Sequence, residues 1–185
     1  MTQEEKQKKK DLRKQVMARI SSLDEAYTRQ ADSQIVECLL SLPEYREAKS
    51  VFCFVGTDHE INTTPFLERV LADGKELCVP LCVGKHEMQA RHITSLSQLK
   101  PGFYGLLEPD PDSGVTVGPR TIDLAVIPCV SCSHDGARLG HGGGFYDVYF
   151  SRNPQISNNR FFYNDRIIVI IVALYDMVLC VQKFK

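Results

Sequence analysis

The strongest constraint on the fold is an apolar run at residues 124–127, which lies between Asp123 and Pro128. A short run without polar side chains is typical of a strand that is covered on both faces of a sheet. A glycine-rich segment follows at residues 140–144. Because ligands of α/β sheets bind where loops leave the carboxyl ends of strands, the loop after Pro128 is the first place to expect a functional site.

Further strands and helices alternate with this strand along the chain. Apolar runs predict strands at residues 51–55, 77–81 and 167–174, and a weaker strand at residues 88–93. Apolar side chains recur every four positions between about residues 4 and 21, as in an amphipathic helix. This order predicts that the whole 185-residue chain forms one α/β domain. We expect a three-layer sandwich, with a largely parallel or mixed central sheet and helices on both faces.

Polar residues predict where two other helices begin and end. Ser22 and Glu25 have the spacing of a capping box, so a second helix can begin there and end by Pro43. Thr64 can cap a third helix that ends before Gly74.

Prolines predict the edges of the fold. Pro80 cannot donate a hydrogen bond to a ladder, so the strand at residues 77–81 ends there or lies at an edge. The Pro, Gly and Asp content of residues 108–120 predicts a surface loop.

The charges exclude a strong overall attraction to nucleic acid or to an anionic membrane, because 22 basic and 23 acidic side chains leave a formal net charge of -1. Residues 1–19 nevertheless carry seven Lys or Arg against three acids. This basic arm is either a solvated helix face or an anion-binding arm. RNA binding is disfavoured, because no aromatic side chains interleave with these cations.

The sequence also predicts where the protein acts. The apolar run at residues 167–174 is too short to cross a bilayer, which requires about 20 residues. The basic arm lacks the apolar core of a signal peptide. Seven cysteines, an odd number scattered along the chain, favour reduced thiols. We therefore expect a cytoplasmic protein with neither membrane nor nucleic acid as a partner.

The chemistry is concentrated in the segment from Arg138 to Asp147, which places four glycines within five positions between a cation and an acid. Glycine amides can approach phosphate oxygens closely, and a helix that begins near Phe145 adds its positive end. Arg138 can supply a forked cation, and Asp147 can supply an oxygen ligand for Mg²⁺. The spacing fits neither the P-loop nor the dinucleotide-binding fingerprint. The segment therefore predicts a phosphate cradle for an unspecified nucleotide, and a flexible glycine turn is the alternative.

Four further stretches accompany the sequence RLGHGGGFYD at residues 138–147. They are KKDLR at residues 9–13, EINT at 60–63, GKELCVP at 74–80 and LLEP at 106–109. Taken together and in this order, they resemble the 5-formyltetrahydrofolate cyclo-ligase family, also called methenyltetrahydrofolate synthetase. An ordered series is more specific than any one of its members.

This resemblance implies a ligase that depends on ATP and Mg²⁺ and converts 5-formyltetrahydrofolate into 5,10-methenyltetrahydrofolate, ADP and phosphate. The formyl oxygen would attack the γ-phosphoryl group, and the amine at position 10 would close onto the activated carbon. No enzyme nucleophile is needed, so the protein has to align the substrates and stabilise the charge of the phosphoryl group. We expect the chain to act as a monomer, on a folate that can carry a polyglutamate tail.

The resemblance also implies roles for individual residues. ATP would be held by Lys9, Lys10, Asp11, Leu12, Arg13, Arg138, Leu139, Gly140, His141, Gly142, Gly143, Gly144, Phe145 and Tyr146. The folate would contact Val55, Glu60, His141, Gly142, Gly143, Gly144 and Phe145. Glu60 would accept hydrogen bonds from the pterin, and Asp147 would ligate Mg²⁺. Arg138 and Asp147 are the expected catalytic residues.

The chain departs from the family pattern at its C-terminal end. Residues 152–166 match poorly, and residues 171–175 resemble the start of a late strand. The stretch that leads into the family's final strand, and a second aspartate near the metal, are missing. We therefore expect residues 152–185 to be diverged or truncated. The alternative function is a folate- and nucleotide-binding module of the same fold with impaired catalysis.

A zinc site is a separate alternative. Cys129, Cys132, His134 and His141 offer four ligands of the kind that tetrahedral zinc favours. No second close Cys/His pair accompanies them at finger-like spacing, which disfavours this interpretation.

Overall fold

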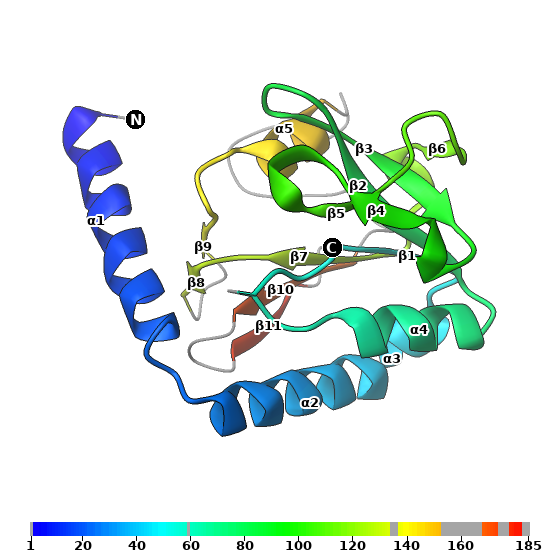
Figure 1. Cartoon of the computed structure of the whole chain (residues 1–185), viewed down its shortest axis with the longest axis horizontal. Coiled ribbons are helices and arrows are strands. Elements are labelled where there is room, and N and C mark those ends of the chain that lie inside the picture. The colour runs from blue at the N-terminus through cyan, green and yellow to red at the C-terminus, as the bar shows by residue number, and fades with distance from the viewer. Residues whose placement is uncertain (1, 59, 134–136, 153–167, 174–177, 183–185) are drawn as a thin grey trace.

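The computed structural model describes residues 2–58, 60–133, 137–152, 168–173 and 178–182. Within these residues, seven strands form one mixed sheet in the order β11-β10-β7-β1-β2-β3-β6 (Figure 1). The bounds are β1 Ser50–Cys53, β2 Glu76–Gly84, β3 Glu87–Ile93, β6 Thr116–Val117, β7 Leu124–Pro128, β10 Ile168–Ala173 and β11 Val178–Gln182. The prediction of a mixed α/β fold is confirmed.

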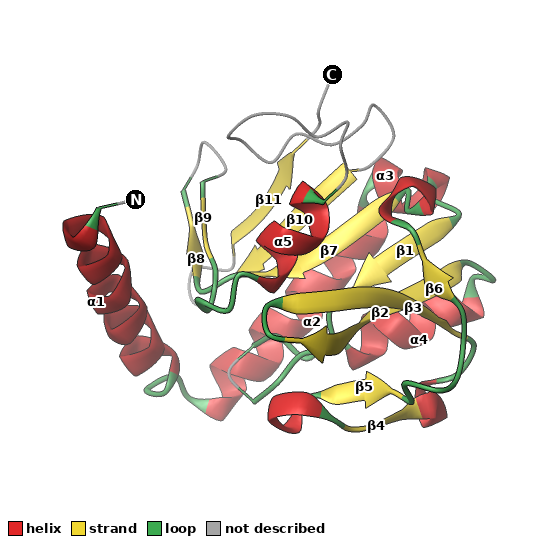
Figure 2. Ribbon diagram, turned by 90° about the horizontal axis from the view of Figure 1, so that it is seen from above, coloured by secondary structure: helices red, strands yellow, loops and turns green. Residues whose placement is uncertain are grey.

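The centre of the sheet is parallel and its two sides are antiparallel. Strand β1 pairs in parallel with β2 and β7, and β7 pairs in parallel with β10 (Figure 2). Strands β3, β6 and β11 add antiparallel pairs. Because β1 and β7 run in parallel, the loops after Cys53 and Pro128 leave the sheet at the same edge.

Two small sheets lie beside the main one. Strand β4 (Leu99–Pro101) pairs with β5 (Leu107–Pro109), and β8 (Ser131–Cys132) pairs with β9 (Arg138–Leu139). Short 3-10 helices cover η1 (Leu96–Gln98), η2 (Phe103–Gly105) and η3 (Pro119–Thr121).

The helices pack against the sheet through two separate clusters of apolar side chains. The bounds are α1 Gln3–Ile20, α2 Glu25–Ser41, α3 Pro43–Glu47, α4 Thr64–Ala72 and α5 Phe145–Ser151. Val51 and Cys53 belong to the cluster that contains Leu39 of α2 and Phe66 of α4. Phe52, which lies between them on β1, belongs to the cluster that contains Phe150 of α5. This alternation follows from the two-residue period of a strand.

Two predicted helix caps are wrong by one or two positions. Asp24, and not Ser22, caps α2, because its side chain accepts a hydrogen bond from the Tyr27 amide at 2.7 Å. Thr63, and not Thr64, is the cap residue of α4. The Thr63 hydroxyl does not bond to the helix, since it donates to the Phe54 carbonyl and accepts from the Gly56 amide.

The strand does not end at Pro80, but the alternative of an edge position is confirmed, whereas the predicted surface loop needs correction. Pro80 lies inside β2, paired with Ala90 of β3, but the ladder between β2 and β1 extends only to Cys78. Pro80 therefore lies where β2 has one ladder neighbour, which is why a residue without an N–H is tolerated. Glu108, expected in a surface loop, is buried in β5, and strand β6 also falls within the range 108–120.

At the C-terminal end, the predicted strand at residues 167–174 is confirmed over β10, and β11 pairs with it. The poorly matching segment at residues 153–166 lies outside the described residues. No helix in the described part of the chain is both long and apolar enough to cross a membrane.

Candidate functional site

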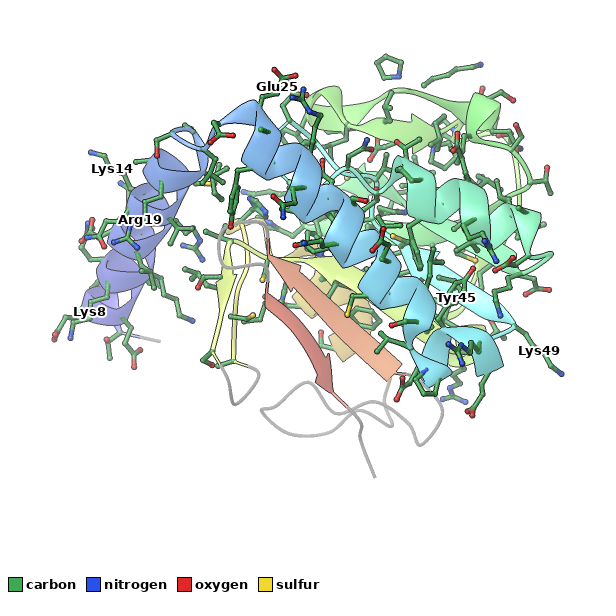
Figure 3. The ribbon with its side chains drawn as sticks, turned by 90° about the horizontal axis from the view of Figure 1, so that it is seen from below. Lys8, Lys14, Arg19, Glu25, Tyr45 and Lys49 are labelled. Atoms are coloured by element: carbon green, nitrogen blue, oxygen red, sulfur yellow. The ribbon has the colours of Figure 1, made fainter. Side chains whose placement is uncertain are left out.

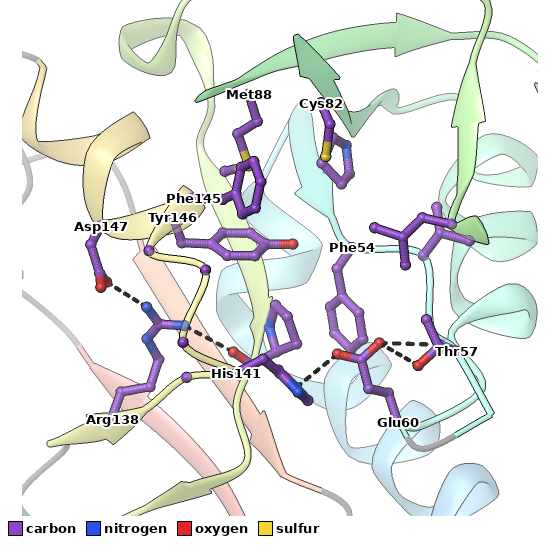
Figure 4. A pocket seen from close by; sticks show the side chains of 18 of the residues that line it. Phe54, Thr57, Glu60, Cys82, Met88, Arg138, His141, Phe145, Tyr146 and Asp147 are labelled. Atoms are coloured by element: carbon purple, nitrogen blue, oxygen red, sulfur yellow. Dashed lines mark hydrogen bonds and ion pairs between the residues drawn. The ribbon is translucent and has the colours of Figure 1, made fainter. Parts of the chain in front are cut away.

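A cavity of about 510 Å³ opens at the sheet edge where β1 and β7 end (Figure 4). One wall contains Arg138 and the glycine loop, which is the segment at residues 140–144. The opposite wall contains Val55, Thr57 and Glu60 from the loop after β1. Lys9 and Arg13 of α1 complete the lining beside the glycine loop. Pro80 and residues 106–108 also line the cavity, so the structure brings all five motifs around it.

Helix α1 contributes one face to this cavity. Lys9 and Arg13 are four residues apart, so they lie on the same side of the helix. The Arg13 Nε donates to the Gly140 carbonyl at 2.6 Å, which joins residues 127 positions apart. Lys10, Asp11 and Leu12 are exposed and lie outside the cavity wall, so the geometry gives no support to their predicted contact with ATP.

Other cations of α1 extend away from the protein. Lys8, Lys14 and Arg19 are exposed on the helix (Figure 3). The solvated interpretation therefore holds for these cations, whereas Lys9 and Arg13 line the cavity and stay candidates for anion binding.

The glycine loop has a backbone that other residues would not adopt easily. Gly142 has a φ of 102° and Gly144 a φ of 70°, in the left-handed region that favours glycine. A Cβ at Gly143 would lie 2.8 Å from the Phe145 ring. Among the described residues, none accepts a hydrogen bond from the amides of residues 141–144. These amides are therefore donors available to an anion.

Arg138 and Asp147 form an ion pair of 2.5 Å beside the glycine loop. Arg138 also donates to the Pro128 carbonyl at 3.0 Å, and its guanidinium lies 5.7 Å from the centre of the Tyr146 ring. The two residues predicted to bind phosphate and Mg²⁺ thus contact each other. Asp147 is mostly exposed, and no group of three or more His, Cys, Asp or Glu side chains converges in the described residues. One accessible carboxylate fits Mg²⁺ only together with phosphate oxygens, which is a common arrangement for this ion.

On the opposite wall, Glu60 is a carboxylate whose two oxygens already face donors. Its Oε1 lies 3.1 Å from Nε2 of His141, and the side chain is 13% exposed. Its Oε2 accepts from the amide and the hydroxyl of Thr57, at 3.2 and 3.0 Å. The loop itself is held by Asp32 of α2, which accepts from the Asn62 amide at 2.9 Å. Glu60 is therefore a pre-positioned acceptor for a ligand that carries N–H groups.

Between the two polar walls, the cavity is lined by apolar and aromatic side chains, including Phe54, Met88 and Phe145. Burial raises the pKa of Tyr146 well above its usual range, with the nearby Glu60 charge as the next cause. Burial, together with the Glu108 carboxylate, raises the pKa of Cys82 to about 12. Both groups stay protonated at neutral pH, so neither is a nucleophile or an anionic metal ligand.

Three residues near the cavity were not expected from the sequence. Thr57 bonds to Glu60, His86 lies 2.5 Å from the Gly143 carbonyl, and the exposed Tyr104 approaches the Phe145 ring edge-on at 6.5 Å. His86 and Tyr104 both have a positive φ. No sequence signal identifies them, because their importance depends on which loops the fold brings together.

The zinc alternative gains no support. Cys129 is buried, and neither it nor Cys132 belongs to a group of potential metal ligands within the described residues. His134 lies outside these residues.

Comparisons with known proteins agree with one another. The model of the 5-formyltetrahydrofolate cyclo-ligase family matches residues 5–181. A probable 5-formyltetrahydrofolate cyclo-ligase of Schizosaccharomyces pombe is 29% identical over 138 residues, which cover 71% of this chain and 68% of the relative. The 5-formyltetrahydrofolate cyclo-ligase of Haemophilus influenzae is 27% identical over 143 residues, which cover 76% of each chain.

A solved structure has the same fold. The NMR structure of Aquifex aeolicus 5,10-methenyltetrahydrofolate synthetase superposes with a TM-score of 0.72 at 26% identity. The match covers 96% of this chain and 93% of that one.

Proposed function

Because the chain belongs to the 5-formyltetrahydrofolate cyclo-ligase family, we propose that its cavity holds ATP and 5-formyltetrahydrofolate side by side. The ATP-dependent enzyme would close the folate to 5,10-methenyltetrahydrofolate and release ADP and phosphate. The contact between Arg13 and the Gly140 carbonyl carries this proposal, because it joins the basic helix to the glycine loop at one wall of the cavity.

The wall formed by α1 and the glycine loop suits the nucleotide. Lys9, Arg13 and Arg138 supply positive charge, and the amides of residues 141–144 supply directed donors. Fixed cations and amides of this kind stabilise the charge of a phosphoryl group in transfer. The binding energy of the nucleotide would thus come from groups that need little rearrangement.

The wall formed by Val55, Thr57 and Glu60 suits the folate. A reduced pterin presents N–H donors along one ring edge, and Glu60 presents a carboxylate that is held in place by Thr57. Phe54 and Phe145 supply apolar surface for the ring system. With the two ligands on facing walls, the formyl oxygen and the γ-phosphoryl group would meet between them.

The reaction then needs alignment and charge stabilisation only. The formyl oxygen forms a bond to the γ-phosphorus while the bond from this phosphorus to ADP breaks. The amine at position 10 next attacks the formyl carbon and loses its proton, and phosphate leaves with the former formyl oxygen. Arg138, which is held by Pro128 and Asp147, would lie beside the site of this phosphoryl transfer.

Mg²⁺ would be held by Asp147 together with phosphate oxygens of the nucleotide. It would supply further neutralising charge to the phosphoryl group. Asp147 suits this role because its carboxylate is accessible, and its ion pair with Arg138 would loosen or rearrange as the ion binds.

The proposal also covers the layering of the helices, the oligomeric state and the cellular compartment. We place the helices in layers on both sides of the sheet, because two apolar clusters divide the core residues of β1 between them. We expect a monomer, because both proposed subsites lie within one chain. We expect the reducing environment of the cytoplasm, because Cys38, Cys53, Cys78 and Cys82 are free thiols.

The proposal is tested by mixing the purified chain with ATP, Mg²⁺ and 5-formyltetrahydrofolate and following the absorbance of methenyltetrahydrofolate. Product should form only when ATP is present, with stoichiometric release of ADP. Binding of both ligands without product would contradict the enzyme and select the catalytically impaired binding module.

A further inference from the structure

The hairpin that joins β2 to β3 reaches the glycine loop. His86, in the turn of this hairpin, adopts a φ of 62°, and its Nδ1 lies 2.5 Å from the Gly143 carbonyl oxygen. A carbonyl oxygen only accepts hydrogen bonds, so Nδ1 must carry the proton in this contact. The imidazole therefore donates to the glycine loop from a part of the chain 57 residues away.

The same hairpin is attached at a second point. Glu87 forms an ion pair of 2.5 Å with Arg152, directly after the end of α5. Met88 packs in the same apolar cluster as Phe150 of α5. The hairpin thus contacts the chain before α5 and after it.

The contact at Gly143 has a consequence for the amide that follows. In a trans peptide, the carbonyl of Gly143 and the N–H of Gly144 point in opposite directions. His86 does not line the cavity, whereas Gly143 and Gly144 both do. A carbonyl held toward His86 therefore turns the Gly144 N–H away from the hairpin.

The loop is also held on both sides of Gly143, because His141 lies 3.1 Å from Glu60 and the Gly144 carbonyl accepts from the Val148 amide at 2.9 Å, but among the described residues only His86 contacts the Gly143 carbonyl. Gly142 and Gly144, on either side of Gly143, give this backbone conformational freedom that other residues lack. Arg13 holds the Gly140 carbonyl at one end of the loop, and His86 holds the Gly143 carbonyl at the other. The amides between these anchors are the donors that the proposed nucleotide site offers to phosphate oxygens.

We propose that His86 is a positioning residue that orients the amides of the glycine loop for the phosphates of ATP. This inference rests on the proposed function, because it assumes that the loop binds the nucleotide. His86 would act through the Gly143 peptide and not through contact with the substrate. The resulting order of the loop before binding is preorganisation, which strengthens binding without adding a contact.

Two variants of His86 distinguish the effect of its N–H donor from the effect of its backbone conformation. His86→Gly keeps the positive φ but removes the donor. His86→Asn keeps an N–H donor close to the position of Nδ1, and asparagine also tolerates a positive φ. Glu87→Gln is the matched control, because it weakens the other attachment of the same hairpin without touching the glycine loop.

The readouts are the dissociation constant of a non-hydrolysable ATP analogue and the separate KM values for ATP and folate. In His86→Gly, the dissociation constant of the ATP analogue and the KM for ATP should both rise about threefold to tenfold, because one hydrogen bond is lost. The KM for folate should stay unchanged. His86→Asn and Glu87→Gln should retain the wild-type nucleotide constants. The ¹⁵N resonances of His86 in the free protein should report a protonated Nδ1.

Several outcomes would overturn the inference. Unchanged nucleotide binding in a folded His86→Gly variant, an equal loss of folate and nucleotide binding, or no rescue by asparagine would each exclude the positioning role. A neutral His86 protonated at Nε2 would exclude the contact itself. Failure of the wild-type chain to bind the ATP analogue would instead refute the proposed nucleotide site, and this measurement precedes the variants.

Discussion

Arg138 and Asp147 are paired at 2.5 Å, yet their surroundings differ, because the Arg138 side chain is 5% exposed and that of Asp147 is 55% exposed. Arg138, the buried partner, also donates to the Pro128 carbonyl. For Asp147, the exposed partner, the contact with Arg138 is the only side-chain hydrogen bond among the described residues. The pair therefore joins a rigid cation to an accessible carboxylate. Substitutions of the two residues should differ in their consequences.

Asp147→Asn should distinguish the role of Asp147 in binding Mg²⁺ from its contact with Arg138. The amide oxygen can still accept from Arg138, so the melting temperature should change little. The concentration of Mg²⁺ that gives half-maximal activity should rise about tenfold or more, because a lost interaction with a charged group costs about 1.5 to 3 kcal/mol. Titration of Mg²⁺ at saturating ATP and folate measures this shift.

Arg138→Ala provides the comparison. In that variant kcat should fall by about 10² to 10³, by analogy with the loss of one charge-stabilising donor.

Equal Mg²⁺ dependence in Asp147→Asn and the wild-type protein would remove Asp147 from the metal site. Retained turnover in Arg138→Ala would remove the guanidinium from the mechanism.

Glu60→Gln should act on the folate alone. Glutamine keeps an oxygen that can accept from Thr57, but it loses the charge that faces His141 and, in our proposal, the pterin. The KM for 5-formyltetrahydrofolate should rise about tenfold to hundredfold, while the KM for ATP stays unchanged, because hydrogen bonds to charged groups contribute about 1.5 to 3 kcal/mol. Steady-state kinetics with each substrate varied in turn give both constants. A parallel rise in the two KM values would show that Glu60 supports the whole cavity and does not recognise the folate.

Cys38, Cys78 and Cys82 should differ in their reactivity with alkylating reagents. Cys38 is exposed on α2, whereas burial raises the pKa of Cys78 to about 11 and burial with Glu108 raises that of Cys82 to about 12. At pH 8 a thiol with a pKa of 12 is about one part in ten thousand thiolate, so it reacts slowly. Mass spectrometry after brief treatment with iodoacetamide should therefore find Cys38 modified and Cys82 unmodified. Rapid labelling of Cys82 would show that the cavity opens more widely than the structure indicates.

Much of the fold could be predicted from the sequence, because the strands in the core are continuous apolar runs. The apolar runs at β1, β7 and β10 predict strands that the structure contains, and the family resemblance is confirmed. The basic helix and the glycine loop were expected to cooperate, and Arg13 contacts the loop. Signals of this kind are local, or they belong to an ordered motif series.

The remaining features could not be predicted for two reasons. Some depend on contacts between distant parts of the chain, and others require a choice between neighbouring residues that suit the same role. Asp24 and Ser22 are both residue types that cap helices well, so residue type alone does not identify Asp24 as the cap of α2. Pro80 is tolerated inside β2 because β1 ends its ladder at Cys78. The bond from His86 to the Gly143 carbonyl joins two loops whose proximity requires the complete sheet.

Gly142→Ala should impair the nucleotide site through the backbone. The φ of 102° at this position is one that residues with a Cβ rarely adopt, and such strain costs about 1 to 3 kcal/mol. The loop should relieve this strain by shifting its amides, so the dissociation constant of the ATP analogue should rise about fivefold or more, because 1.4 kcal/mol corresponds to a factor of ten. Gly118→Ala is the control, since that glycine has a φ of -74° and a Cβ there would meet no atom within 4 Å. Calorimetric binding of the analogue to both variants decides the question, and equal affinities would show that the conformation of the loop at Gly142 does not govern nucleotide binding.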